Sequence, residues 1–168
     1  DGFYERDGEE IGFVISVMSG EQDRIDIAQA AAQQLKEVGI DCTVEVPTEV
    51  DWGGQMAYLI GWGSPFDADD HTYKVFGTDK GANYSSYSNA LVDQYLIEAR
   101  ESADPEVRAE AYDKFQEELA KDPAFTFICY IDANYVANSS IQGISADTVM
   151  GHHGVGIFWN VADWTIGN

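Results

Sequence analysis

The stretch from Ile11 to Val46 constrains the fold more than any other part of the chain, because two strand patterns flank one helix pattern. Apolar residues occupy every second position from Ile11 to Val17 and again from Ile40 to Val46, as in strands with one buried face. Residues 21–39 begin with acidic residues, carry apolar residues at helical spacing and end at a glycine, which commonly ends a helix. This order predicts a right-handed crossover and parallel strands.

Further strand patterns follow. Residues 56–62 (MAYLIGW) form an apolar run without alternation, typical of a strand covered on both faces. Residues 125–131 (FTFICYI) predict another buried strand, and residues 134–138 (NYVAN) predict its partner. Gly-rich, aromatic chain follows from Ser139 onward.

Three more helices are predicted, each beginning at a residue that favours the N-cap position. Asp67, Asn89 and Asp104 would cap helices that run to about residues 77, 102 and 122. In the last helix, apolar residues recur every four positions at Val107, Ala111, Phe115 and Leu119. Together the elements predict an α/β fold for residues 1–168 as a single domain, with a mixed central β-sheet flanked by helices.

The charge of the chain excludes some partners. Thirty acidic residues against nine basic ones give a formal net charge of −21, so nucleic acid and anionic membrane surfaces are not expected partners. An acidic proteome adapted to salt or acid would explain the same charge, and this alternative stays open. Cys42 and Cys129 both fall in apolar, strand-like segments, which favours free buried thiols over a disulfide.

The chain also resembles a known family. The ordered features are the GW strand with its Gly/Asp/Pro-rich loop, NYSSYSN before VDQYLIEAR, DPEVRAEAYDKFQEELAKDP, and then FTFICY. This order resembles the C-terminal part of the peptide/nickel class (family 5, cluster C) of ABC-transporter solute-binding proteins. The resemblance runs from about Gly2 to Ile144. Family members are about three times longer.

The resemblance implies a lobe of the type II periplasmic-binding-protein kind, cut from a larger two-lobe protein. Such a protein is periplasmic or a cell-surface lipoprotein, and a signal peptide would precede the full-length chain. It binds a small peptide or a related solute such as a nickel chelate. Its partners would be the N-terminal lobe of the same full-length chain and the permease and ATPase subunits of the importer. No catalysis and no resident cofactor are expected.

The loop after residues 56–62 is the first candidate ligand site, because ligands in α/β sheets sit beyond the carboxyl ends of strands. In peptide-binding relatives, an aspartate three residues after the tryptophan pairs with the ligand's amino group. Pro65 occupies that position here, so Asp67 could take over the role or could serve only as the helix cap. The predicted ligand-binding residues are Trp62, Gly63, Ser64, Pro65, Phe66, Asp67, Asn83 and Tyr84.

Two of these residues, Asn83 and Tyr84, lie on a glycine-flanked loop that suits polar ligand contacts. Ordinary turn chemistry explains the same residues. The alternative functions are a metal-binding module that uses His71, His152 and His153, and an acidic α/β hydrolase. No motif typical of catalysis occurs in the sequence.

Overall fold

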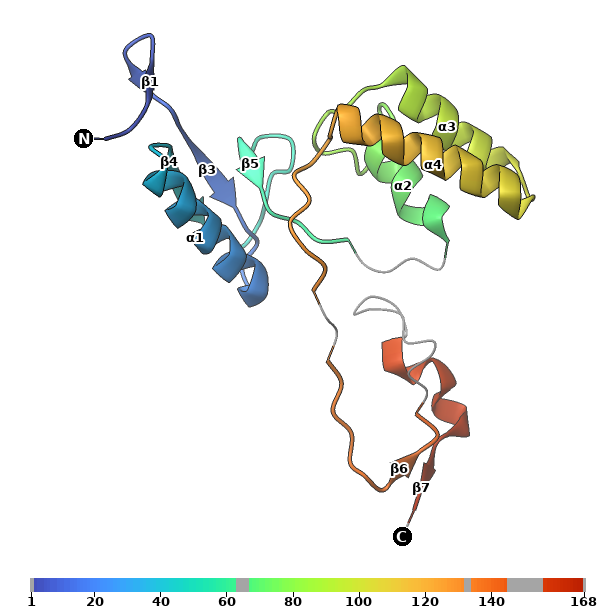
Figure 1. The fold of residues 1–168 in the computed structure, drawn as a ribbon. Coiled ribbons are helices and arrows are strands. Elements are labelled where there is room, and N and C mark those ends of the chain that lie inside the picture. The colour runs from blue at the N-terminus through green and yellow to red at the C-terminus, as the bar shows by residue number, and fades with distance from the viewer. Residues whose placement is uncertain (1, 63–66, 132–133, 145–155, 168) are drawn as a thin grey trace. The chain divides into compact units, whose positions relative to one another are not determined.

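The computed structural model describes residues 2–62, 67–131, 134–144 and 156–167. The chain divides into two compact units, residues 1–61 and 62–168. Each unit has its own arrangement of elements (Figure 1), and each is described by itself.

The first unit is built on a three-stranded parallel sheet. Its strands are β3 (Gly12–Ser16), β4 (Asp41–Glu45) and β5 (Ala57–Tyr58), in the order β4-β3-β5. Strands β3 and β4 pair in parallel over five residues, so the predicted parallel pairing is confirmed. Before β3, the short strands β1 (Glu5–Arg6) and β2 (Glu9–Glu10) form an antiparallel hairpin.

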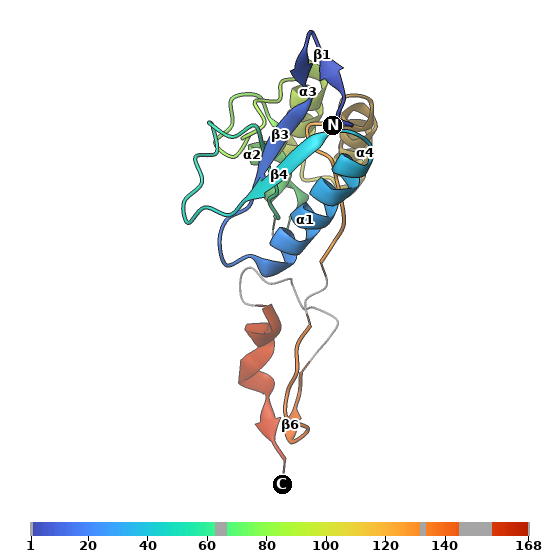
Figure 2. The ribbon, with the colours of Figure 1, turned by 90° about the vertical axis from the view of Figure 1, so that its left-hand side faces the viewer.

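Helix α1 (Gln22–Glu37) connects β3 to β4 and lies along the sheet beside β4 (Figure 2). It buries Ile25, Ala28 and Ala32, which recur at helical spacing. Ile25 and Ala28 form a core with Val17, which follows directly after β3. At the other end of the helix, Gly39 adopts a φ of 85°, a conformation that suits glycine and ends the helix before β4.

The second unit contains the helices α2 (Ala68–Phe76), α3 (Ala90–Glu101) and α4 (Pro105–Lys121). Helices α3 and α4 pack side by side, and α2 packs against α3 (Figure 1). The three predicted N-caps are confirmed, because Asp67, Asn89 and Asp104 each accept a hydrogen bond from a backbone amide of the first turn.

The core of the second unit lies between these helices. Its buried members are Tyr87, Val92, Leu96, Phe115 and Leu119. The predicted apolar face of α4 is confirmed at Ala111, Phe115 and Leu119, whereas Val107 at the start of the helix is 40% exposed.

The last elements of the chain are small. Strands β6 (Ile141–Gln142) and β7 (Thr165–Ile166) pair antiparallel, and the 3₁₀ segment η1 (Gly156–Asp163) precedes β7. Asn160 joins them, because its side-chain amide donates to the Gly143 carbonyl and its side-chain oxygen accepts from the Trp164 indole.

The predicted α/β fold is therefore confirmed, but three strand predictions need correction. Within the described part of the chain, residues 125–131 and 134–138 form no strand, and only Ala57–Tyr58 of residues 56–62 does. A strand needs a neighbour for its amides and carbonyls, and no described segment pairs with residues 125–131. Both thiols are free as expected, yet Cys129 is exposed and only Cys42 is buried.

Candidate functional site

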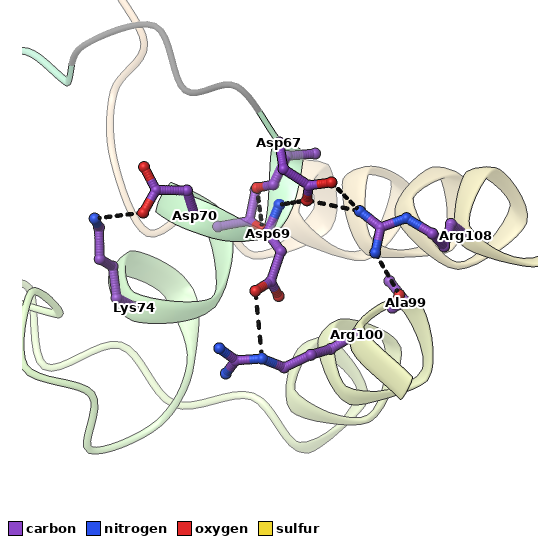
Figure 3. A network of polar contacts seen from close by, with 9 residues as sticks. Asp67, Asp69, Asp70, Lys74, Ala99, Arg100 and Arg108 are labelled. Carbon is purple, nitrogen blue, oxygen red and sulfur yellow. Dashed lines mark hydrogen bonds and ion pairs between the residues drawn. The ribbon is translucent and has the colours of Figure 1, made fainter. Parts of the chain in front are cut away.

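The candidate site begins at Asp67, the residue that caps α2. Its Oδ1 accepts a hydrogen bond from the Asp69 amide at 2.8 Å. Both of its carboxylate oxygens also accept from Nη2 of Arg108 in α4, at 2.6 and 2.8 Å (Figure 3). The Asp69 amide and the Arg108 guanidinium hold the pKa of the Asp67 carboxyl below its ordinary value. Asp67 is therefore a charged cap that is already paired within the chain.

Arg108 connects three helices at this point. Its Nη2 binds Asp67 at the start of α2, and its Nη1 donates to the carbonyl of Ala99 near the end of α3, at 3.1 Å. A second arginine reinforces the corner, because Nε of Arg100 lies 3.3 Å from Oδ2 of Asp69 (Figure 3). The guanidinium of Arg100 also lies 3.9 Å from the ring centre of Tyr73, at cation–π distance.

An aromatic cluster forms at Trp62, the residue at which the second unit begins. The Trp62 ring is stacked on Tyr84, with centroids 6.1 Å apart and an interplanar angle of 19°. It also lies 5.7 Å from the His71 ring in α2. Trp62 is 36% exposed, so part of this flat surface is open to solvent. Aromatic surface of this kind suits the apolar part of a small solute.

The loop between α2 and α3 is organised by Asn83. Its side-chain amide donates to the carbonyls of Gly77 and Tyr87, at 2.9 and 2.7 Å. Its side-chain oxygen accepts from the Tyr87 amide and from the Ser85 hydroxyl. Asn83 thus holds the loop together by turn chemistry, and it places Tyr84 beside Trp62.

Of the predicted site residues, the structure brings together Trp62, Tyr84 and His71, and it places Asp67 against Arg108. Gly63, Ser64, Pro65 and Phe66 lie outside the described residues, as do His152 and His153. The ligand-binding role of the whole set stays a prediction.

Sequence reasoning missed Arg108. A signal for it exists: a cation in the first turn of a helix opposes the helix dipole. Arg108 is the fourth residue of α4, so the dipole favours an anion near its side chain.

The described residues contain neither a metal-binding cluster nor a membrane-spanning helix. No group of three or more His, Cys, Asp or Glu side chains in residues 2–62, 67–131, 134–144 and 156–167 is arranged to hold a metal ion. Within the same ranges, no helix is long and apolar enough to cross a membrane.

Comparison with known proteins decides the family. No family model matches the chain. Protein XP55 of Streptomyces lividans is 35% identical over 151 residues, which cover 86% of this chain and 28% of that protein. The oligopeptide-binding protein AppA of Bacillus subtilis is 25% identical over 178 aligned positions, covering 98% of this chain and 31% of AppA.

Among solved structures, NikZ of Campylobacter jejuni in complex with Ni(L-His) matches 98% of the chain, with a TM-score of 0.84 and 35% identity. The chain belongs to the peptide/nickel family of ABC-transporter solute-binding proteins. AppA of B. subtilis, solved with a nonapeptide, has the same fold, with a TM-score of 0.74 and 23% identity over 100% of the chain.

The chain spans about a third of the family members it matches, since it covers 35% of NikZ and 34% of AppA in the structural alignments. The residues compared therefore correspond to one part of each longer relative.

Proposed function

We propose that the chain is the C-terminal lobe of an extracytoplasmic solute-binding protein of an ABC importer. It would hold a small peptide or a related solute, such as a nickel chelate, against a partner lobe, and it would perform no catalysis. One observation carries this proposal: the match to NikZ extends over 98% of this chain but only 35% of NikZ. AppA, one of the relatives that the chain matches, is an oligopeptide-binding protein.

The exposed segment at residues 125–131 supports the assignment to a lobe. Phe127 is 68% exposed and Tyr130 is 102% exposed. A run of aromatic and β-branched residues in this state is typical of a surface that another part of a protein covers. A second lobe of the same longer chain would supply that cover, and closure of the two lobes about a hinge would enclose the solute.

The solute would meet the aromatic cluster of Trp62, His71 and Tyr84. Backbone donors of Gly63 and Ser64, with Pro65 and Phe66, would complete the proposed ligand loop. The strong negative charge of the chain fits a protein whose partners are a solute, a permease and an ATPase, and does not fit nucleic acid. An importer of this kind places the binding protein outside the cytoplasm, in the periplasm or anchored as a lipoprotein.

Calorimetry on two forms of the protein tests the proposal. The longer protein that contains this chain, and the 168-residue chain alone, are each titrated with Ni(L-His), with nickel ion and with a nonapeptide. We expect the longer protein to bind Ni(L-His) or the nonapeptide, and we expect the 168-residue chain to bind both weakly, because half of the contacts are missing. Binding of nickel ion alone would instead favour a metal-binding module.

A tryptophan variant locates the site. Trp62→Ala in the longer protein should weaken binding, whereas Trp159→Ala, which removes another exposed tryptophan, should leave binding unchanged. The proposal would be contradicted if the longer protein bound neither Ni(L-His) nor the nonapeptide. Micromolar binding of the nonapeptide by the 168-residue chain would also contradict it.

A further inference from the structure

The corner where α2 begins, α3 ends and α4 begins has a function that the family assignment does not state. We propose that Arg108 is a positioning residue, which holds Asp67 in place as the cap of α2. Asp67 then supports the ligand site by placing α2, and it does not pair with a cation of the ligand. The part of this inference that concerns ligand binding rests on the proposed function.

The first argument is the geometry at Asp67. Its Oδ1 already accepts from the Asp69 amide and from Arg108, and its Oδ2 accepts from Arg108 as well. Both contacts to Arg108 come from its Nη2, and a hydrogen bond between two charged groups is stronger than one between neutral groups. A ligand ammonium at Asp67 would compete with this guanidinium for the same carboxylate.

The second argument is the unfavourable interaction between the Arg108 charge and the dipole of α4. A positive charge in the first turn of α4 opposes the helix dipole, so the position is unfavourable unless an anion faces it. Arg108 is also anchored at its other nitrogen by the Ala99 carbonyl. Its side chain is only 23% exposed, compared with 58% for Asp67. The Arg108 side chain is therefore held between the helices at both of its terminal nitrogens and is not a mobile surface charge.

The third argument connects the corner to the aromatic cluster. His71 follows Asp67 by one helical turn in α2, and its ring contacts Trp62. The hydrogen bonds at Asp67 set where the first turn of α2 begins, and that turn carries His71. Loss of the pair would therefore disturb the contact between His71 and Trp62.

The first test measures this contact in the 168-residue chain, without a ligand. Nuclear Overhauser contacts between the Trp62 indole and the His71 ring are compared in the wild type, Arg108→Gln, Asp67→Ser and the double variant. Serine retains an N-cap but is too short to reach the guanidinium, so Asp67→Ser removes the bridge and keeps the cap. We expect each single variant to lose the contact, and the double variant to lose no more than either single one.

Two controls separate positioning from general loss of stability. Lys114→Gln removes one positive charge from the same helix, where Lys114 pairs with Glu110, and it should leave the contact intact. Asn89→Ala removes the cap of α3, so it lowers stability without touching Asp67. A wild-type contact in Arg108→Gln, or its loss in Asn89→Ala to the same extent, would overturn the inference.

The second test uses the longer protein and two forms of one probe, a nonapeptide with a free amino terminus and the same nonapeptide acetylated there. If Arg108 positions α2, Arg108→Gln and Asp67→Ser weaken binding of both forms by the same factor. If Asp67 pairs directly with the ligand's ammonium, Asp67→Ser weakens only the free form and Arg108→Gln does not weaken it, which would refute the inference.

The two proposals can fail separately. If the wild-type longer protein binds neither the nonapeptide nor Ni(L-His), the proposed function fails. The contact between Trp62 and His71 still decides, in the 168-residue chain, whether Arg108 positions α2.

Discussion

Leu96 offers a direct test of the core that supports the candidate site. It lies in α3 and is 1% exposed. It belongs to the cluster with Val92, Phe115 and Leu119, which joins α3 to α4. Replacement of a buried leucine by alanine removes transfer free energy and leaves a cavity, at a cost of about 2–5 kcal/mol. Because Leu96 is sealed between two helices, we expect Leu96→Ala to lower the free energy of unfolding by about 3–4 kcal/mol.

The adjacent residue provides the matched control. Ile97 is 44% exposed on the same helix, so Ile97→Ala should cost less than about 1 kcal/mol. Urea unfolding gives the free energies, and the slope with urea should stay unchanged if only stability is altered. Since the chain has two compact units, amide hydrogen exchange in α3 and α4 is the readout that reports on the second unit.

A clear outcome would refute the reasoning. If Leu96→Ala costs less than about 1 kcal/mol, or the same as Ile97→Ala, then the packing of α3 on α4 does not stabilise the second unit. The corner at Asp67 would then need another support.

Three further predictions follow from contacts in the structure. Hydrogen bonds lower the pKa values of Asp67 and Asp70 in the folded protein, from the Asp69 amide and from Lys74 respectively. The stabilisation from these two carboxylates is complete above the ordinary pKa of 3.8 and is lost as the pH falls through the lowered values. Melting temperatures recorded down to pH 2 should therefore drop at low pH, and less steeply in Asp67→Ser. Cys129 should react promptly with Ellman's reagent, whereas Cys42, whose burial raises the pKa of its thiol, should react only after urea is added. Asn83→Ala removes the side chain that holds its loop and should lower the free energy of unfolding, measured by urea titration, by about 1–3 kcal/mol. A variant as stable as the wild type would contradict the structural role of Asn83.

Local chemistry explains why the helices could be predicted well. Asp67, Asn89 and Asp104 bind amides two or three residues away, so each helix start depends only on its immediate sequence. The parallel pairing of β3 with β4 was also predictable, because a short crossover leaves few other arrangements.

The segment at residues 125–131 shows where this reasoning stops. Its apolar pattern has the character of a strand, but a strand also needs a partner that offers free amides and carbonyls. Whether such a partner exists depends on the rest of the molecule and not on the segment itself. For the same reason, burial of Cys42 in β4 was predictable from its pattern, and exposure of Cys129 was not.

The candidate site shows a similar division. The capping role of Asp67 could be predicted from its position before a helical pattern. Its pairing with Arg108 could not, because the two residues are separated by 41 positions and meet only through the packing of three helices. The stacking of Trp62 on Tyr84 likewise depends on the path of the loop that Asn83 organises.

The N-caps of α2, α3 and α4 have a wider consequence. Each helix closes its first turn with the side chain of its own cap residue, so the start of each helix is set at the cap position itself. Substitutions in those loops can then alter the chemistry presented to a solute while the helical frame keeps its alignment. This separation of frame and loop offers a physical explanation for relatives of one fold that were solved with partners as different as a nonapeptide and Ni(L-His).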